Sequence, residues 1–551
     1  MESSQVLRLP AQSISCVAQE GSTGQQPRRD DSEGKHVSDS ERPTPRVDFI
    51  DLPNEIILYI LGHLPEDDLY GLSLLSRRMN YMSLPLYLSR RSFGSRPNDR
   101  LVLFDYNSRD VLRALNVTLF KTSLTRLHYP LDCEKPPGEL KRELRAMHGL
   151  LTRNLSSLRE VTIDFHNIID LQLFDLVLQT PVSEVVPKVV PSSGVPNELQ
   201  SELIELLDAV IDSGCMSLAI TYCGSQRPVM DNIDDTISLD FGWGARMCWQ
   251  SLRPLASLFR ASASNAKNNN LEAIYLHSSV SFHPHLARWT IEILNSSRIT
   301  SLSISQQLCI GAHSWALILP CVAIPMLTNL SLDSCTFRLS DLFKFVNRHP
   351  NIRKLSLGRS FRFTDAQRSL SIRKLGKLAY LSAPPHALVP FLRVATEIST
   401  PLLSSITILL RVPHEQNFTL GMLDDPLDSS FPRLKSMTEL HLALSFGSIP
   451  TTWLDPLADA DSSHSTANTS TTGVRTLITH LEVHIKVYSL PFPLATKLTE
   501  LLVQFPNLKR VKVVTLSKVD PLTALQKDIA IRVMTDSCPQ LDSVEFVAEE
   551  L

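Results

Sequence analysis

Apolar residues recur in a short pattern along most of the chain: an apolar residue, two residues of any type, a second apolar residue, one residue of any type, and a third apolar residue. Its occurrences begin at Leu158, Leu271, Ile299, Leu327, Ile352, Leu403, Met437, Ile478, Leu508 and Leu541. Alternation over the last three positions is typical of a strand with one buried face. Stretches with helical character, such as Leu339–Val346 and Leu494–Gln504, separate the occurrences. The pattern therefore predicts strands alternating with helices.

A second kind of pattern occupies residues 50–88, where apolar residues follow helical spacing. Ile56, Ile57, Ile60, Leu61 and Leu64 form one stripe that begins after Pro53 and ends at Pro65. Acidic residues 66–68 then suit the first turn of a second helix that carries Leu69, Leu72 and Leu75. Ser76 is placed to cap a third helix, which we expect to close at Leu84-Pro85. Three short helices cannot bury this much apolar surface, so we expect a partner to cover the surplus.

The run LPNEIILYILGHLPEDDLYGLSLLSRR, residues 52–78, resembles the F-box motif in the order and spacing of its Leu-Pro, Glu-Ile, Leu-Pro, Asp-Leu and Ser-Arg pairs. The resemblance implies binding to a Skp-type adaptor and, through it, to a cullin–RING ubiquitin ligase. Carried over by position, the adaptor-binding residues are Leu52, Pro53, Ile56, Ile60, Leu61, Leu64, Pro65, Leu69, Leu72 and Leu75. One departure is Met79, where the family usually has Trp. The alternative is that the apolar stripe packs against the rest of the chain.

The repeated pattern resembles leucine-rich repeats, above all in LTNLSLDSC, where Cys335 stands at the position that those repeats give to Asn or Cys. The fold class that follows is α/β, with a short N-terminal helical F-box and then an irregular leucine-rich-repeat-like solenoid. We expect a disordered tail at 1–46, the F-box at 47–93, a linking region with early irregular repeats at 94–270 and the solenoid at 271–551. Proline-rich residues 180–197 and polar residues near 459–473 are expected to form loops. The alternative is an ordinary α/β domain whose strands begin alike.

In such a solenoid, the residues between the buried positions face one open side of the sheet. The expected client-binding residues are Tyr275, Ser303, Ser331, Arg353, Ser356, Arg373 and His441, with Glu482, Lys512 and Glu545 at equivalent positions. Residues 353–377 carry eight basic residues against one acid, Asp365, so an acidic or phosphorylated client segment could bind there. The alternative is a solvated basic face.

Composition narrows the functional classes. The 551 residues carry a net charge of −3, which argues against a protein built to neutralise nucleic-acid phosphates. Nine scattered cysteines without a C-x-x-C pair indicate free thiols in a reducing compartment. The sequence shows neither a secretory signal nor an uninterrupted apolar span, so we expect a cytoplasmic and/or nuclear protein that binds no membrane.

Catalytic and metal-binding motifs do not emerge. The chain has no phosphate-binding G-x-x-x-x-G-K-[ST], no H-E-x-x-H and no G-x-S-x-G. His283-Pro284-His285 lacks further ligands, and Asp231, Asp234 and Asp235 lack the Gly and Glu of a calcium loop. We therefore expect no cofactor and no enzyme activity. The expected function is client recognition in a Skp–cullin–F-box ubiquitin ligase, leading to ubiquitin-dependent protein catabolism; the alternative is a non-catalytic binding scaffold that acts without ubiquitination.

Overall fold

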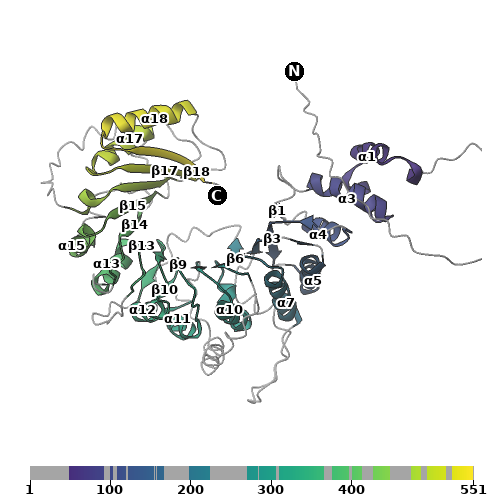
Figure 1. The fold of residues 1–551 in the computed structure, drawn as a ribbon, viewed down its shortest axis with the longest axis horizontal. Coiled ribbons are helices and arrows are strands. Elements are labelled where there is room, and N and C mark those ends of the chain that lie inside the picture. Colours follow the sequence, from purple (N-terminus) through teal and green to yellow (C-terminus); the bar gives the residue numbers. More distant parts are fainter. Residues whose placement is uncertain are drawn as a thin grey trace, which may run out of the picture. The chain divides into compact units, whose positions relative to one another are not determined.

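A computed structural model gives the fold of the chain (Figure 1). It describes residues 49–91, 100–102, 108–119, 122–133, 135–153, 155–156, 158–166, 198–223, 270–282, 284–305, 310–364, 375–395, 400–412, 423, 426–446, 473–485, 493–516 and 524–549. The predicted tail at 1–46, the proline-rich loop, nearly all of the polar loop and Arg373 lie outside these residues.

The chain divides into two compact units, Met1–Tyr59 and Ile60–Leu551, with the boundary inside helix α1 (Asn54–His63). The first unit holds the 3₁₀ turn η1 (Phe49–Asp51) and the beginning of α1. The carbonyl of Pro53 accepts hydrogen bonds from the amides of Ile56 and Ile57, so the proline stands immediately before the first turn, as the sequence predicts. Glu55 lies in that first turn, where a carboxylate is favourable.

The second unit continues with α2 (Glu66–Ser73) and α3 (Arg77–Arg91). The hydroxyl of Ser76 accepts a hydrogen bond from the amide of Met79 at 3.2 Å, which confirms the predicted cap. The prediction that this helix closes at Pro85 is wrong, because α3 continues through the proline to Arg91.

Tertiary contacts hold the last turn of α3. Arg90 donates to the carbonyls of Leu64 and Gly62 at 2.5 and 2.6 Å, and Arg91 pairs with Glu66. A proline inside a helix removes one hydrogen bond. We infer that these contacts compensate for that loss, which local sequence rules cannot anticipate.

The remainder of the second unit is built on a parallel sheet of 14 strands, in which each strand neighbours the next one along the chain. These strands are β1 (Arg100–Val102), β3 (Arg126–Asp132), β5 (Glu160–His166), β6 (Ser217–Cys223), β7 (Ala273–Leu276), β8 (Ser301–Ile304), β9 (Asn329–Leu332), β11 (Lys354–Leu357), β13 (Tyr380–Ala383), β14 (Ser405–Val412), β15 (Glu439–Phe446), β16 (His480–Ile485), β17 (Arg510–Leu516) and β18 (Ser543–Glu549). Two further pairs are parallel: β2 (Thr122–Ser123) with β4 (Leu155–Ser156), and β10 (Thr336–Phe337) with β12 (Arg362–Phe363).

Helices connect the strands, as parallel pairing requires a crossover. They are α4 (Ser108–Asn116), α5 (Pro137–Arg153), α7 (Glu198–Asp212), α10 (Pro284–Ser296), α11 (Ala312–Ile318), α12 (Leu339–Arg348), α13 (Pro385–Val394), α15 (Phe431–Lys435), α17 (Pro493–Val503) and α18 (Ala524–Ser537), with short 3₁₀ turns η5 (Ser279–Phe282), η6 (Leu319–Cys321), η7 (Asp428–Ser430) and η8 (Val474–Leu477). Helices α7, α10, α11, α12 and α13 lie on the same side of the sheet (Figure 1). The predicted combination of a helical N-terminal segment with a mixed α/β part is confirmed.

Each occurrence of the apolar pattern coincides with a strand. In β8, for example, Leu302 and Ile304 are buried while Ser303 between them is partly exposed. Four strands of the large sheet were not predicted: β1, β3, β6 and β13. In the last three, the pattern places Tyr129, Cys215 and Ala383 where most other repeats have Leu, Ile or Val, so the alternation is present but its residue types are atypical.

The register of the sheet changes once between β15 and β16. In the strands before this change, each repeat binds the equivalent position of the preceding repeat: the amide of Thr328 donates to the carbonyl of Thr300, and the amide of Thr438 donates to the carbonyl of Ser404. The amide of Thr479 instead binds the carbonyl of Leu440, two residues further along. A two-residue shift keeps every side chain on its own face, but it changes which side chains are neighbours.

Candidate functional site

The first unit presents apolar side chains on the exposed side of α1. Tyr59 is 71% exposed, and Ile56 and Leu58 are exposed as well, whereas Ile57 is fully buried. Of the residues predicted to bind an adaptor in this unit, Pro53 and Ile56 are exposed and Leu52 is half-buried. The helix is thus apolar on two sides, one of which faces solvent in this chain.

The second unit has its own exposed apolar side chains near the junction of α2 and α3. Leu75 is 73% exposed and Leu74 is 56% exposed, and Tyr81 on α3 is also exposed. Side chains of this size rarely remain in water without a partner when they are neighbours. The helical stripe identified Leu75 but missed Leu74 and Tyr81, because they lie off the apolar face that the spacing defines.

The other predicted adaptor-binding residues of this unit differ in burial. Pro65 is exposed, and Ile60, Leu64 and Leu72 are half-buried. Leu61 and Leu69 are fully buried inside the chain, where they stabilise the helices rather than present surface. Met79, which stands where the F-box motif usually has Trp, is buried too.

The side chain of Asn80 joins α3 to the segment that follows α4. Its amide nitrogen donates to the carbonyl of Val117 at 2.9 Å and to that of Ser73 at 3.3 Å, and its oxygen accepts from the amide of Leu119 at 3.1 Å. Asn80 is buried, so its own polar atoms depend on these partners rather than on water. Sequence patterns gave no signal for this joint.

The face of the sheet opposite the core carries most of the predicted client-binding residues. Tyr275, Ser303, Ser331 and Ser356 stand in one register row on β7, β8, β9 and β11. Their short neighbours leave Tyr275 exposed and the serines half-buried. Arg353 is exposed just before β11, where its backbone joins the sheet by binding Thr328.

The same row continues through Ser382 and Thr407 to His441. The sequence pattern equates His441 with Glu482. Because of the register shift, this equivalence is wrong: His480 lies opposite His441, and Glu482 lies opposite Ala443.

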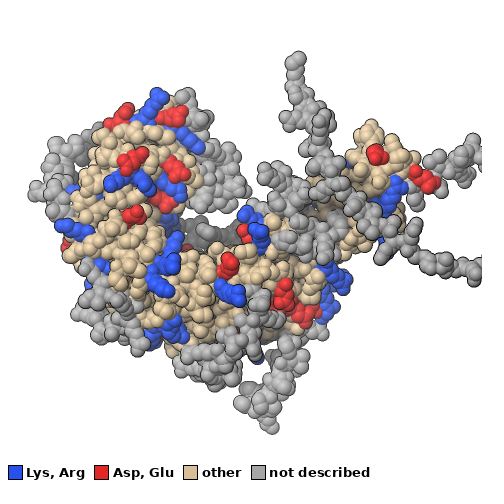
Figure 2. Space-filling view, viewed as in Figure 1, with Lys and Arg blue, Asp and Glu red and all other residues tan. Residues whose placement is uncertain are grey.

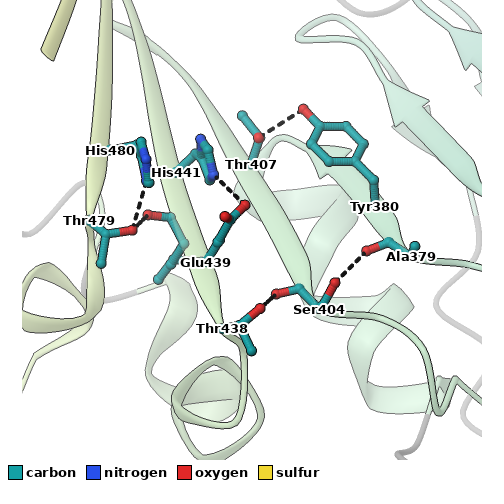
Figure 3. Close-up of polar contacts among 10 residues, drawn as sticks. Ala379, Tyr380, Ser404, Thr407, Thr438, Glu439, His441, Thr479 and His480 are labelled. Atoms are coloured by element: carbon teal, nitrogen blue, oxygen red, sulfur yellow. Dashed lines mark hydrogen bonds and ion pairs between the residues drawn. The ribbon is translucent and has the colours of Figure 1, made fainter. Parts of the chain in front are cut away.

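Figure 3 shows the polar contacts around this part of the sheet. The hydroxyls of Tyr380 and Thr407 are 2.8 Å apart, and Nε2 of His441 lies 3.4 Å from Oε2 of Glu439. The rings of His441 and His480 stack with centroids 4.2 Å apart and an interplanar angle of 8°. Burial lowers the pKa of His480, and so does the neighbouring His441, which favours a neutral ring in the stack.

A cleft of about 400 Å³ lies in the helical layer, lined by residues of α11, η6 and α12. Its two basic side chains have partners in the chain: Lys344 contacts Oδ1 of Asp341 at 3.4 Å, and Arg348 donates to the carbonyls of Leu319 and Pro320. Oδ2 of Asp341 and Oδ1 of Asn347 are buried without a hydrogen-bond partner in the described part of the chain. The cleft contains none of the site residues that the sequence predicted. Among the described residues, no group of three or more His, Cys, Asp or Glu is placed to hold a metal ion.

Comparison with protein families gives a match at the N-terminal helices. Residues 49–94 match the F-box-like family, and no curated protein matches the chain. F-box domains generally bind Skp-type adaptors, so the match suggests an F-box adaptor role in ubiquitin ligase complexes. None of the helices that the structure describes is both long enough and apolar enough to cross a membrane. In its N-terminal helices, this chain therefore has an F-box-like domain.

Proposed function

We propose that the chain is a client-recognition subunit of a Skp–cullin–F-box ubiquitin ligase. The observation that carries this proposal is the F-box-like match at residues 49–94. The apolar side chains that this segment leaves exposed in each unit, with Leu75 and Tyr59 foremost, support adaptor binding, because contact with a partner would remove them from water.

The α/β part is proposed to be an irregular leucine-rich-repeat-like solenoid that holds the client. Sequential parallel strands with a recurring apolar pattern support this proposal. So does Cys335, whose thiol donates to the carbonyl of Asp333 at 3.0 Å and is buried where leucine-rich repeats place Asn or Cys. Ubiquitin transfer would be carried out by other subunits, with this chain raising the local concentration of the client.

The experiment is capture of a purified Skp-type adaptor by the full chain and by a Leu74→Ser/Leu75→Ser variant. Both leucines are exposed, so the changes should not unfold the chain, and we expect a loss of affinity of at least tenfold, roughly 1.4 kcal/mol. Leu402→Ser is the matched control, because Leu402 is 57% exposed but precedes β14. Equal capture by the wild-type chain and the double variant would contradict this docking surface.

A second measurement separates ligase function from a simple scaffold. The captured complex is combined with a cullin–RING ligase and the ubiquitin-transfer enzymes, and ubiquitin on proteins that co-purify with the chain is measured. We expect ubiquitin transfer with the wild-type chain and a marked decrease with the double variant. Adaptor capture without transfer would instead support a binding scaffold that acts without ubiquitination.

A further inference from the structure

The part of the chain between Asn351 and Val412 is basic. Its described residues include seven Lys or Arg and no Asp or Glu; the basic residues are Arg353, Lys354, Arg359, Arg362, Lys377, Arg393 and Arg411. The whole chain has 54 basic and 57 acidic residues, so this excess of positive charge is local. An excess of one sign on a surface favours partners of the opposite sign.

Lys354 belongs to the open face of the sheet. It begins β11, in which Leu355 and Leu357 are fully buried, so alternation places Lys354 and Ser356 on the other side. Its Nζ lies 4.9 Å from the ring centroid of Tyr380 on the neighbouring strand. This contact fixes the ammonium group beside the row of small hydroxyl residues.

Arg359 follows the other end of the same strand. Its Nε is buried, and within the described part of the chain it has no hydrogen-bond partner. Burial lowers the pKa of its guanidinium and Arg411 acts in the same direction, while Asp333 and Glu482 raise it. Arg359 as a whole is only half-buried, so part of its side chain faces solvent. A guanidinium partly removed from water is stabilised by an anionic partner at its accessible atoms.

The two nearby acids bind other donors. Asp333 accepts a hydrogen bond from the backbone amide of Ser360 at 3.4 Å. Glu482 accepts from Lys512 at 2.8 Å, and Nε2 of His484 lies 3.5 Å from the same oxygen. Because of His484 first, and then Lys512, the pKa of Glu482 falls to about 2, so this carboxylate remains charged and bound to them.

We propose that the open face of β11, with Lys354 at one end and Arg359 at the other, binds an acidic segment of a partner protein through separate Asp or Glu carboxylates. This inference rests on the proposed function, since the partner would be the client. A guanidinium matches a carboxylate with two parallel hydrogen bonds. Ser331 and Ser356, paired across β9 and β11, put short side chains rather than bulky ones beside the two cations.

Carboxylates fit this surface better than a single phosphate. Lys354 and Arg359 stand at opposite ends of a strand, and Arg411, the basic neighbour of Arg359, already has an interaction within the chain. On the one face of the molecule that Figure 2 shows, Lys and Arg side chains lie in several groups, with Asp and Glu side chains among them. Single, spaced charges match a segment that carries several spaced acids.

The test uses the full-length chain and a fluorescein-labelled decapeptide of alternating Glu and Gly, followed by fluorescence anisotropy. Two comparison probes are used. One is a peptide of alternating Gln and Gly, and the other is that Gln peptide with one phosphoserine. Lys354→Gln/Arg359→Gln should weaken binding of the Glu peptide about tenfold or more, and added salt should weaken it further. Arg393→Gln is the matched control, because Arg393 belongs to the same basic stretch but is exposed on α13 in the helical layer.

Four outcomes would overturn the inference. They are no binding of the Glu peptide, unchanged binding in the Lys354→Gln/Arg359→Gln variant, an equal loss in the Arg393→Gln variant, and tighter binding of the phosphoserine peptide than of the Glu peptide. The double variant should retain the wild-type urea midpoint, because the buried Nε of Arg359 makes no hydrogen bond that the substitution would remove. A lower midpoint together with unchanged peptide binding would assign Arg359 a structural role only. Adaptor capture is measured separately, so failure of the F-box proposal would not be mistaken for failure of this one.

Discussion

Replacing Asn80 by Ala should loosen the joint between the F-box-like helices and the beginning of the α/β part. The wild-type carboxamide makes three hydrogen bonds, to the carbonyls of Val117 and Ser73 and from the amide of Leu119. Alanine makes none of them. Because Asn80 is buried, its replacement by alanine would leave the facing backbone groups without their side-chain partner.

The magnitude follows from those bonds. Each hydrogen bond contributes about 1 kcal/mol net, and a buried group left without a partner costs about 1–3 kcal/mol. The 3.3 Å bond to Ser73 is long and contributes least. We therefore expect Asn80→Ala to lower the free energy of unfolding by about 3 kcal/mol, which lies in the upper range of single substitutions.

Hydrogen exchange measured by mass spectrometry reports this change locally. Peptides that contain Leu119 should exchange about 100-fold faster in the variant if exchange proceeds through opening of the joint. Asn507→Ala is the control, because Asn507 is exposed and makes a single described hydrogen bond, to the carbonyl of Thr476. If Asn80→Ala accelerates exchange less than fivefold, or if its cost does not exceed that of the control, the buried amide does not hold the two parts together.

Two further predictions concern the packing of single residues. Nε2 of His349 accepts from the amide of Ile324 at 2.9 Å, so Nδ1 donates to the carbonyl of Phe345, and burial lowers the pKa to about 4. Between pH 6.5 and 4 the unfolded chain takes up a proton that the folded chain excludes, so the free energy of unfolding should fall by roughly 3 kcal/mol as the pH falls through this window. Urea denaturation measured across this pH range should show a smaller decrease for His349→Gln than for the wild-type chain. The same decrease in both proteins would reject the assignment to His349. A Cβ at Gly358 would lie 1.8 Å from Oδ1 of Asp333. Gly358→Ala should therefore cost about 1–3 kcal/mol, and Asp333→Ala should recover most of that cost in a double-mutant cycle; independent, additive costs would refute the clash.

Much of the secondary structure follows from sequence patterns alone. The ten occurrences of the apolar pattern all coincide with strands, because alternate burial on a pleated strand is a local consequence of its geometry. Pro53 and Ser76 likewise stand at helix starts. The hydroxyl of Ser76 accepts a hydrogen bond from an otherwise unpaired amide of the first turn, and Pro53 has no amide N–H that would need a partner. The F-box-like segment could be recognised for the same reason: its motif is an ordered set of local positions.

Tertiary structure decided which residues meet. Spacing places Leu61 and Leu75 alike on apolar faces, yet one is fully buried and the other is mostly exposed, since burial depends on what packs against a face. Local pattern also equates His441 with Glu482, whereas hydrogen bonding between distant strands aligns His441 with His480. The joint at Asn80 is likewise a contact between residues almost forty positions apart in the sequence. Periodicity specifies the face of an element, while register, burial and long-range hydrogen bonds arise only when the elements pack together.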